Sequence, residues 1–352
     1  KSEELLIGLF NSYVRTENFA KQKEIAMKLY KQFPHERYLM WSIMCTALQA
    51  RVSGTQGAQL LQISQKMFEK LLDKIKDVEA LAIYLFILEQ QNQYQEIVKL
   101  LTTNTKLMGL YKVNSERKQY VASMHVKLQQ FQEANVLYKE LLETYADDWA
   151  NILSYLDSGF KKSDNNKKQF LDEAKSFIQS LQTKESQDKI RGPFLAEIEL
   201  ESRALTHLPA ETSSQKIQKL LVDYFSKYGD RNACFGDIKA YLSNPAIIPR
   251  DKAAVNSFLD SLKSVIPADS EEKVQEQNIS RWTTYYSIHR YLAAATLNGL
   301  NEQETVQHAN SVLDVFVKST QLPSVQKKEA TEFNIGDNAL LLTVHTLLSL
   351  AA

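Results

Sequence analysis

The residue types that could carry catalysis form no recognisable site in this sequence. His35-Glu36 begins like the zinc-protease motif His-Glu-x-x-His, but Leu39 stands where the second histidine ligand is required. Phosphate-binding loops of the GxxxxGK(S/T) or GxGxxG type and the GxSxG nucleophile turn are absent. The six histidines are scattered, with no pair four residues apart: His35, His125, His207, His289, His308 and His345. We therefore predict no catalytic residues and no metal site.

Adjacent carboxylates and cysteines have simpler explanations than catalysis. Asp147-Asp148 and Glu271-Glu272 adjoin predicted helix starts, where N-capping and the helix dipole favour acidic side chains. Cys45 and Cys234 lie far apart in the chain, which suits neither a disulfide framework nor a four-cysteine zinc site. We interpret them as reduced, buried thiols of an intracellular protein.

The charge balance gives no reason to expect a DNA partner. The 352 residues carry 42 Lys and Arg against 42 Asp and Glu, a formal net charge of zero, whereas nucleic-acid-binding proteins usually show a basic excess or stripe. We interpret two lysine clusters as solvated helix faces, with an anionic partner such as ribosomal RNA or an inositol phosphate as the alternative. The clusters are Lys21, Lys23, Lys28 and Lys31, and Lys161, Lys162, Lys167 and Lys168.

The composition favours long helices joined by short loops. The chain has 10 Gly and 7 Pro, below the ordinary usage of about 7% and 5%, which disfavours the many tight turns of an all-β fold. We find no apolar run near the roughly 18 residues of a membrane span. The first residues, Lys1-Ser2-Glu3-Glu4, contain neither an initiator Met nor a signal peptide. We expect a cytoplasmic chain that is an excerpt of a longer protein.

Helical hairpins recur through the first part of the chain. The apolar residues between Leu5 and Tyr13 follow one helix face, and a second helix runs to Phe33 before Pro34. Three further hairpins are predicted with helices at 37–50 and 60–75, 78–89 and 94–101, and 116–128 and 131–145. They resemble tetratricopeptide repeats, but their spacing is nearer 37 residues than 34. The predicted fold is all-α, an αα-hairpin solenoid of degenerate tetratricopeptide-like repeats.

The helical pattern continues beyond residue 146 with looser periodicity. Asp147-Asp148 predicts the N-cap of a helix that starts at Trp149. About sixteen helices are expected in all, the last at 337–350. We divide the chain into repeats at 1–146 and a continuing helical array at 147–352, with further soft boundaries near 161–168 and 183–193.

Three stretches resemble more than a generic repeat. They are Asp147-Asp148-Trp149 with Tyr155 to Phe160, Arg191-Gly192-Pro193 running to Leu200, and Tyr224 to Asp230 running into Cys234 to Lys239. In this order and spacing they resemble the auxiliary subunit of the NatB N-terminal acetyltransferase. A weaker match is the stretch 341–348.

The resemblance implies a non-catalytic scaffold. Such subunits wrap around a catalytic partner of the GNAT fold, which uses acetyl-CoA to acetylate nascent chains beginning Met-Asp, Met-Glu, Met-Asn or Met-Gln. They also assist ribosome association, and some are linked to actin organisation. The residues agree that acetyl-CoA binds the partner, because the GNAT loop Gln/Arg-x-x-Gly-x-Gly/Ala is matched only by Arg51 to Gln56, which ends in Gln and follows no strand.

Seven residues in these family-like motifs are candidates for contacting the partner. They lie near predicted inter-helix turns: Arg191, Phe194, Tyr228, Asp230, Phe235, Asp237 and Lys239. The alternative is that the motifs pack one hairpin on the next. A second function also stays open, that of a general repeat adaptor or chaperone cofactor that binds a peptide in its concave groove.

Overall fold

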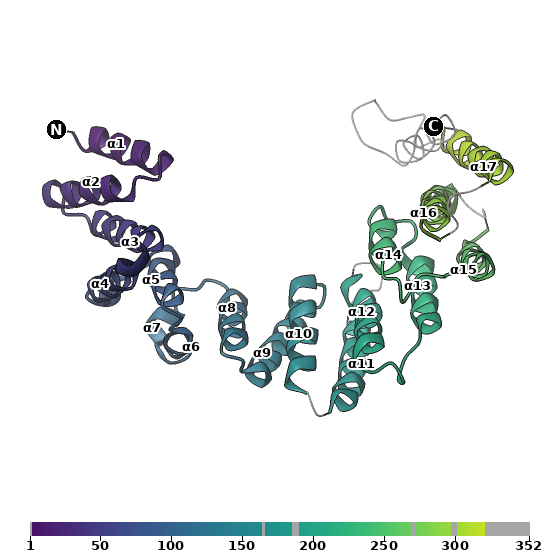
Figure 1. Ribbon diagram of the computed structural model, residues 1–352, viewed down its shortest axis with the longest axis horizontal. Coiled ribbons are helices and arrows are strands. Elements are labelled where there is room, and N and C mark those ends of the chain that lie inside the picture. The colour runs from purple at the N-terminus through teal and green to yellow at the C-terminus, as the bar shows by residue number, and fades with distance from the viewer. Residues whose placement is uncertain (1, 164–165, 185–189, 269–271, 297–300, 321–352) are drawn as a thin grey trace. The chain divides into compact units, whose positions relative to one another are not determined.

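The computed structural model describes residues 2–163, 166–184, 190–268, 272–296 and 301–320 (Figure 1). Within these ranges the chain forms seventeen α-helices and two short 3-10 helices, Gly54–Gln56 and Leu72–Lys74, and no strand. The predicted all-α repeat fold is confirmed. None of the helices in the described part is long and apolar enough to cross a membrane.

Contacts divide the chain into two compact units. One comprises Lys1–Tyr145 with Ser154–Lys162, and the other comprises Ala146–Leu153 with Ser163–Ala352. The helices that begin in the first unit are α1 (Glu3–Arg15), α2 (Phe19–Gln32), α3 (Glu36–Val52), α4 (Gly57–Glu69), α5 (Val78–Gln90), α6 (Tyr94–Thr103), α7 (Thr105–Met108), α8 (Asn114–Lys127) and α9 (Phe131–Thr144). Helix α10 (Trp149–Lys162) contributes to both units.

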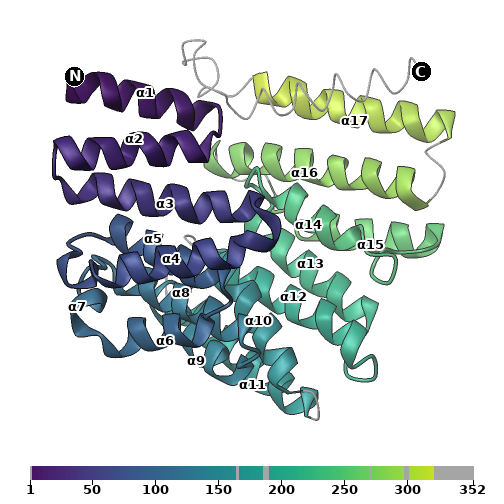
Figure 2. The ribbon, with the colours of Figure 1, turned by 60° about the vertical axis from the view of Figure 1, so that its left-hand side comes forward.

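The first unit is a stack of helical hairpins. Figure 2 shows α1, α2 and α3 lying side by side, and each packs on the next through its apolar face. Leu6, Ile25, Leu29 and Tyr38 join these three helices in one buried cluster. Because a single hairpin cannot cover its own apolar face, stacking supplies the core.

A left-handed residue marks the turn inside each of the four hairpins. Glu17, Gly54, Asn92 and Gln129 have positive φ angles of 50–60°, and their intervals are 37, 38 and 37 residues. After three of these turns a backbone N–H reaches back five residues along the chain, as from Gln93 to the carbonyl oxygen of Leu88 at 2.9 Å. Such hydrogen bonds offset the ~1–2 kcal/mol that a left-handed non-glycine residue costs. The predicted period near 37 residues is confirmed.

Two predicted details of the first unit are wrong. The helix predicted at 60–75 ends at Glu69 and is followed by the 3-10 helix Leu72–Lys74. Leu71 and Ile75 are both buried, so the apolar pattern continues across the change in hydrogen bonding and conceals it. The short helix α7 was also not predicted, since four residues give no periodicity.

The second unit contains the remaining helices. They are α11 (Lys167–Lys184), α12 (Gly192–His207), α13 (Ser214–Tyr228), α14 (Cys234–Leu242), α15 (Lys252–Ser264), α16 (Glu272–Thr296) and α17 (Glu302–Thr320). Its core gathers apolar side chains of α12 to α16, among them Leu221, Phe225, Ile238, Leu259 and Ile288. The helix predicted at 337–350 lies outside the described residues.

Candidate functional site

Two adjacent aspartates of the second unit, Asp147 and Asp148, cap the first turns of two different helices. Asp148 Oδ1 accepts a hydrogen bond from the backbone N–H of Asn151 at 3.1 Å, which confirms the predicted cap of α10. Asp147 Oδ1 accepts from the backbone N–H groups of Arg191 at 3.0 Å and Gly192 at 2.5 Å. Asp147 therefore satisfies free donors at the start of α12, whose N-cap residue Arg191 makes no side-chain cap of its own.

Gly192 has no space for a side chain. An added Cβ would lie 2.7 Å from Asp147 Oδ1, 3.1 Å from Ile152 Cδ1 and 3.2 Å from Asp147 Cα. The Asp-Asp-Trp and Arg-Gly-Pro motifs therefore pack directly on one another, although 45 residues separate Asp147 from Gly192.

One carboxylate oxygen joins three helices. Asp237 Oδ2 on α14 pairs with Arg191 Nη1 at 2.5 Å and accepts a hydrogen bond from the Tyr224 hydroxyl of α13 at 2.7 Å. The side chain of Arg191 is 38% exposed and that of Asp237 is 19% exposed, so water reaches the pair. Burial and the adjacent Asp237 carboxylate raise the pKa of Tyr224. Its hydroxyl consequently remains a donor at neutral pH.

Tyr228, at the end of α13, is buried beneath an aromatic ring that reaches the surface. Its side chain is 1% exposed, and its hydroxyl donates to the carbonyl oxygen of Ile190 at 2.5 Å. The half-buried ring of Phe194 meets it edge-on at 5.6 Å between centroids. Lys227 Nζ lies 3.8 Å from the centroid of Phe194, within the range of a cation–π contact. Phe194 and Lys227 thus lie between the buried tyrosine and solvent.

The turn after α13 is held by α16. Arg281 Nη2 lies 4.0 Å from Asp230 Oδ1, and the Thr284 hydroxyl donates to the carbonyl oxygen of Gly229 at 3.1 Å. Arg281 is 8% exposed and its Nε has no hydrogen-bond partner within the described ranges. Asp230 therefore balances a buried positive charge.

Phe235 and Lys239 lie on a different flank of α14 from Asp237. They are one helical turn apart, and Lys239 Nζ lies 5.9 Å from the centroid of Phe235 and 5.5 Å from that of Tyr291 on α16. Lys239 is exposed, and both rings are half-buried. This flank presents an aromatic surface with one positive charge.

The structure thus distributes the seven predicted positions over separate contacts. Arg191 meets Asp237, Phe194 meets Tyr228, and Phe235 meets Lys239, while Asp230 pairs with Arg281 outside the set. Sequence reasoning missed Asp147, Tyr224, Lys227 and Arg281 as members of this network. Asp147 and Tyr224 belong to the family-like motifs. The sequence, however, indicated Asp147 only as an N-cap of the helix at Trp149 and Tyr224 only as part of the family resemblance. That the seven residues contact a partner stays a prediction.

Two histidines on α16 and α17 and both cysteines lie wholly or partly buried. Burial lowers the pKa of His289 and that of His308, the latter to about 4, and their Nδ1 atoms lie 3.3 Å apart between α16 and α17. Burial raises the pKa of Cys45 to about 12 and raises that of Cys234 further, so neither thiol is an activated nucleophile. Among the residues whose positions are described, no three His, Cys, Asp or Glu side chains are arranged to hold a metal.

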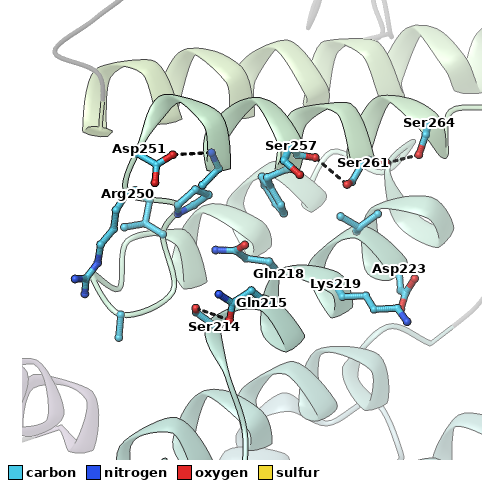
Figure 3. A pocket seen from close by; sticks show the side chains of 16 residues that line it. Ser214, Gln215, Gln218, Lys219, Asp223, Arg250, Asp251, Ser257, Ser261 and Ser264 are labelled. Atoms are coloured by element: carbon cyan, nitrogen blue, oxygen red, sulfur yellow. Dashed lines mark hydrogen bonds between the residues drawn. The ribbon is translucent and has the colours of Figure 1, made fainter.

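An open groove of about 690 Å³ lies between α13 and α15. Figure 3 shows Gln215 and Gln218 on one side of it, with Ser257 and Ser261 on the other. None of the seven predicted positions lines this groove.

Two family models match the chain, and the boundary between them lies next to the Asp147-Asp148-Trp149 motif. Residues 1–142 match the family described as the Psidin N-terminal tetratricopeptide repeat region. Residues 149–352 match the family described as the non-catalytic subunit of the N-acetyltransferase B complex, NatB.

Individual relatives agree with these matches. The chain is 30% identical to the N-terminal acetyltransferase B complex auxiliary subunit NAA25 of Arabidopsis thaliana, over 73% of this chain and 26% of that protein. It is 26% identical to N-alpha-acetyltransferase 25, NatB auxiliary subunit, of Homo sapiens, over 99% of this chain and 38% of that protein. The phagocyte signaling-impaired protein of Drosophila pseudoobscura pseudoobscura is 30% identical over 74% and 28%. The chain therefore spans between about a quarter and two-fifths of the length of these relatives.

Proposed function

Because the chain belongs to the family of NatB non-catalytic subunits, we propose that it is a scaffold that binds and stabilises a catalytic acetyltransferase subunit. The observation that carries the proposal is the family match over residues 149–352, which contains all seven predicted contact positions. The partner is proposed to have the GNAT fold, to bind acetyl-CoA itself and to form a heterodimer with this chain.

We propose that the catalytic subunit contacts the surfaces of α12 to α14. Phe194 with Lys227, and Phe235 with Lys239, each place a cation against a half-buried aromatic ring at the surface. Aromatic side chains at a protein surface often contribute a large part of the binding energy of an interface. The buried Tyr224 and Tyr228, together with the exposed Asp147, hold the helices that carry these rings. We therefore propose that the two surface pairs, Phe194 with Lys227 and Phe235 with Lys239, contact the catalytic subunit. The buried tyrosines are proposed to support the helices that carry these pairs.

The reaction served by the complex is proposed to be acetylation of nascent chains that begin Met-Asp, Met-Glu, Met-Asn or Met-Gln. Ribosome association in the cytoplasm belongs to the same proposal. Since the formal net charge is zero, any ribosome contact made by this chain would use local lysine clusters rather than an overall field.

An acetyl-transfer assay tests the proposal. The chain alone, the catalytic subunit alone and the co-expressed pair are each incubated with acetyl-CoA and peptides starting Met-Asp or Ser-Ala. We expect the chain alone to be inactive and the pair to acetylate Met-Asp peptides faster than the catalytic subunit does. Equal rates with and without the chain would contradict a scaffold role.

A further inference from the structure

The groove between α13 and α15 is a trough rather than a pit. Its α13 wall is a single helix face, and its lining along α13 extends from Ser214 to Asp223. Nine residue steps of a helix span about 14 Å, the length of about four residues of an extended chain. The loop at Ala246 to Asp251 borders one end, and the volume of about 690 Å³ lies within the range of ligand pockets.

The groove combines an apolar strip with small residues. Val222, Ile248 and Phe258 line it from three different segments. Ala254 and Ser257 on α15 carry short side chains, which leave room between the helices for the backbone of a ligand. The strip is therefore suited to an apolar side chain of modest size.

Two glutamines in the groove offer one hydrogen-bond acceptor and one set of hydrogen-bond donors, which complement the backbone of a peptide. Gln218 Nε2 donates to the carbonyl oxygen of Ile247 at 2.6 Å, which leaves its Oε1 as an acceptor. Gln215 Oε1 accepts from the Ser214 hydroxyl at 3.3 Å, which leaves its amide hydrogens as donors. Every peptide unit offers one N–H and one C=O, so the two side chains can pair with the backbone of an extended segment.

The charges of the lining disfavour a polyanion. Lys219 and Arg250 are balanced by Asp223 and Asp251, so the formal charge is zero. Asp251 also accepts a hydrogen bond from the backbone N–H of Ala254 at 2.8 Å, as the cap of α15. A phosphate-rich ligand would need an excess of cations, whereas an uncharged peptide matches this balance.

We propose that this groove binds a short, extended, uncharged peptide segment of a partner protein, with an apolar side chain on the strip and its backbone on Gln215 and Gln218. The site is separate from the surface proposed to hold the catalytic subunit, because the groove shares none of the seven predicted positions. Loss of one can therefore be measured without loss of the other.

The test uses an array of hexapeptides, acetylated and amidated at their ends and built from uncharged residues, probed with the full chain. The strongest binders are then measured in solution by fluorescence polarisation. Ala254→Trp fills the groove, and Ala253→Trp is the matched control because Ala253 is exposed and does not line it. The double variant Gln215→Ala/Gln218→Ala is compared with Gln132→Ala, which alters an exposed glutamine of α9.

We expect Ala254→Trp and the double glutamine variant to weaken peptide binding by about tenfold or more, while both controls bind like the parent. Far-ultraviolet circular dichroism verifies that each variant is folded, and co-purification of the catalytic subunit should be unchanged in all four. The proposal is overturned if no capped peptide binds, if filling the groove leaves binding unchanged, or if the groove variants alter binding of inositol hexakisphosphate instead.

Discussion

Asp147 accepts a hydrogen bond from the backbone N–H of Gly192 at 2.5 Å and so begins a helix 45 residues further along the chain. This contact joins two motifs by which the chain resembles its family. It explains why glycine stands before Pro193, since the space of a Cβ is already taken by the aspartate.

Gly192→Ala should destabilise the chain by about 1–3 kcal/mol, the usual cost of overpacking, because Cβ would lie 2.7 Å from Asp147 Oδ1 and 3.2 Å from its Cα. Urea unfolding measures the change. Gly236→Ala is the control, since nothing lies within 4 Å of its added Cβ and alanine favours a helix. Equal stability of Gly192→Ala and the parent would contradict the packing described.

The Tyr224 hydroxyl should be coupled energetically to the Asp237 carboxylate that it contacts. Tyr224→Phe removes a hydrogen bond to a charged acceptor, which is worth about 1.5–3 kcal/mol, and Asp237→Asn weakens both contacts. A double-mutant cycle by urea unfolding should give a coupling energy of about 0.5–3 kcal/mol. Additive effects of the two substitutions would show that the hydrogen bond contributes nothing.

Acid should destabilise the helix pair α16 and α17 through His308. Burial holds the pKa of folded His308 at about 4, below the ordinary value of 6.5. Between pH 6.5 and 4 the unfolded chain binds a proton that the folded chain does not, so stability falls as pH falls, by up to about 3 kcal/mol. Urea unfolding at several pH values should show a shallower slope for His308→Asn. Parallel slopes would contradict this assignment.

Exposed and buried members of the predicted contact set should respond differently. Lys239→Glu should weaken binding of the catalytic subunit by about tenfold or more, with little change in stability because Lys239 is exposed. Phe235→Ala should weaken binding too, with some loss of stability because this half-buried ring also packs against the core. Tyr228→Phe should lower stability, because the Ile190 carbonyl oxygen loses its donor, and leave affinity unchanged. Isothermal titration calorimetry with the purified catalytic subunit measures the affinities. The reverse pattern would move the interface away from α14.

Local features of this fold follow from the sequence, and long-range ones do not. The cap at Asp148 and the hairpin period near 37 residues depend on neighbours in the chain, so spacing predicted both. Asp147 looked like a second cap of the same helix, because nothing local indicates that its partner is Gly192. The seven predicted positions lie in two of the three motifs. Even so, α14 turns Asp237 and Phe235 to different flanks, and only packing decides which residue is exposed.

The scaffold proposal is tested most directly by native mass spectrometry of the chain co-expressed with the catalytic subunit of its own organism. It predicts a single species whose mass is the sum of one copy of each, and which dissociates to an inactive chain of 40.3 kDa. A spectrum that contains only the separate chains, under conditions where both are folded, would contradict it.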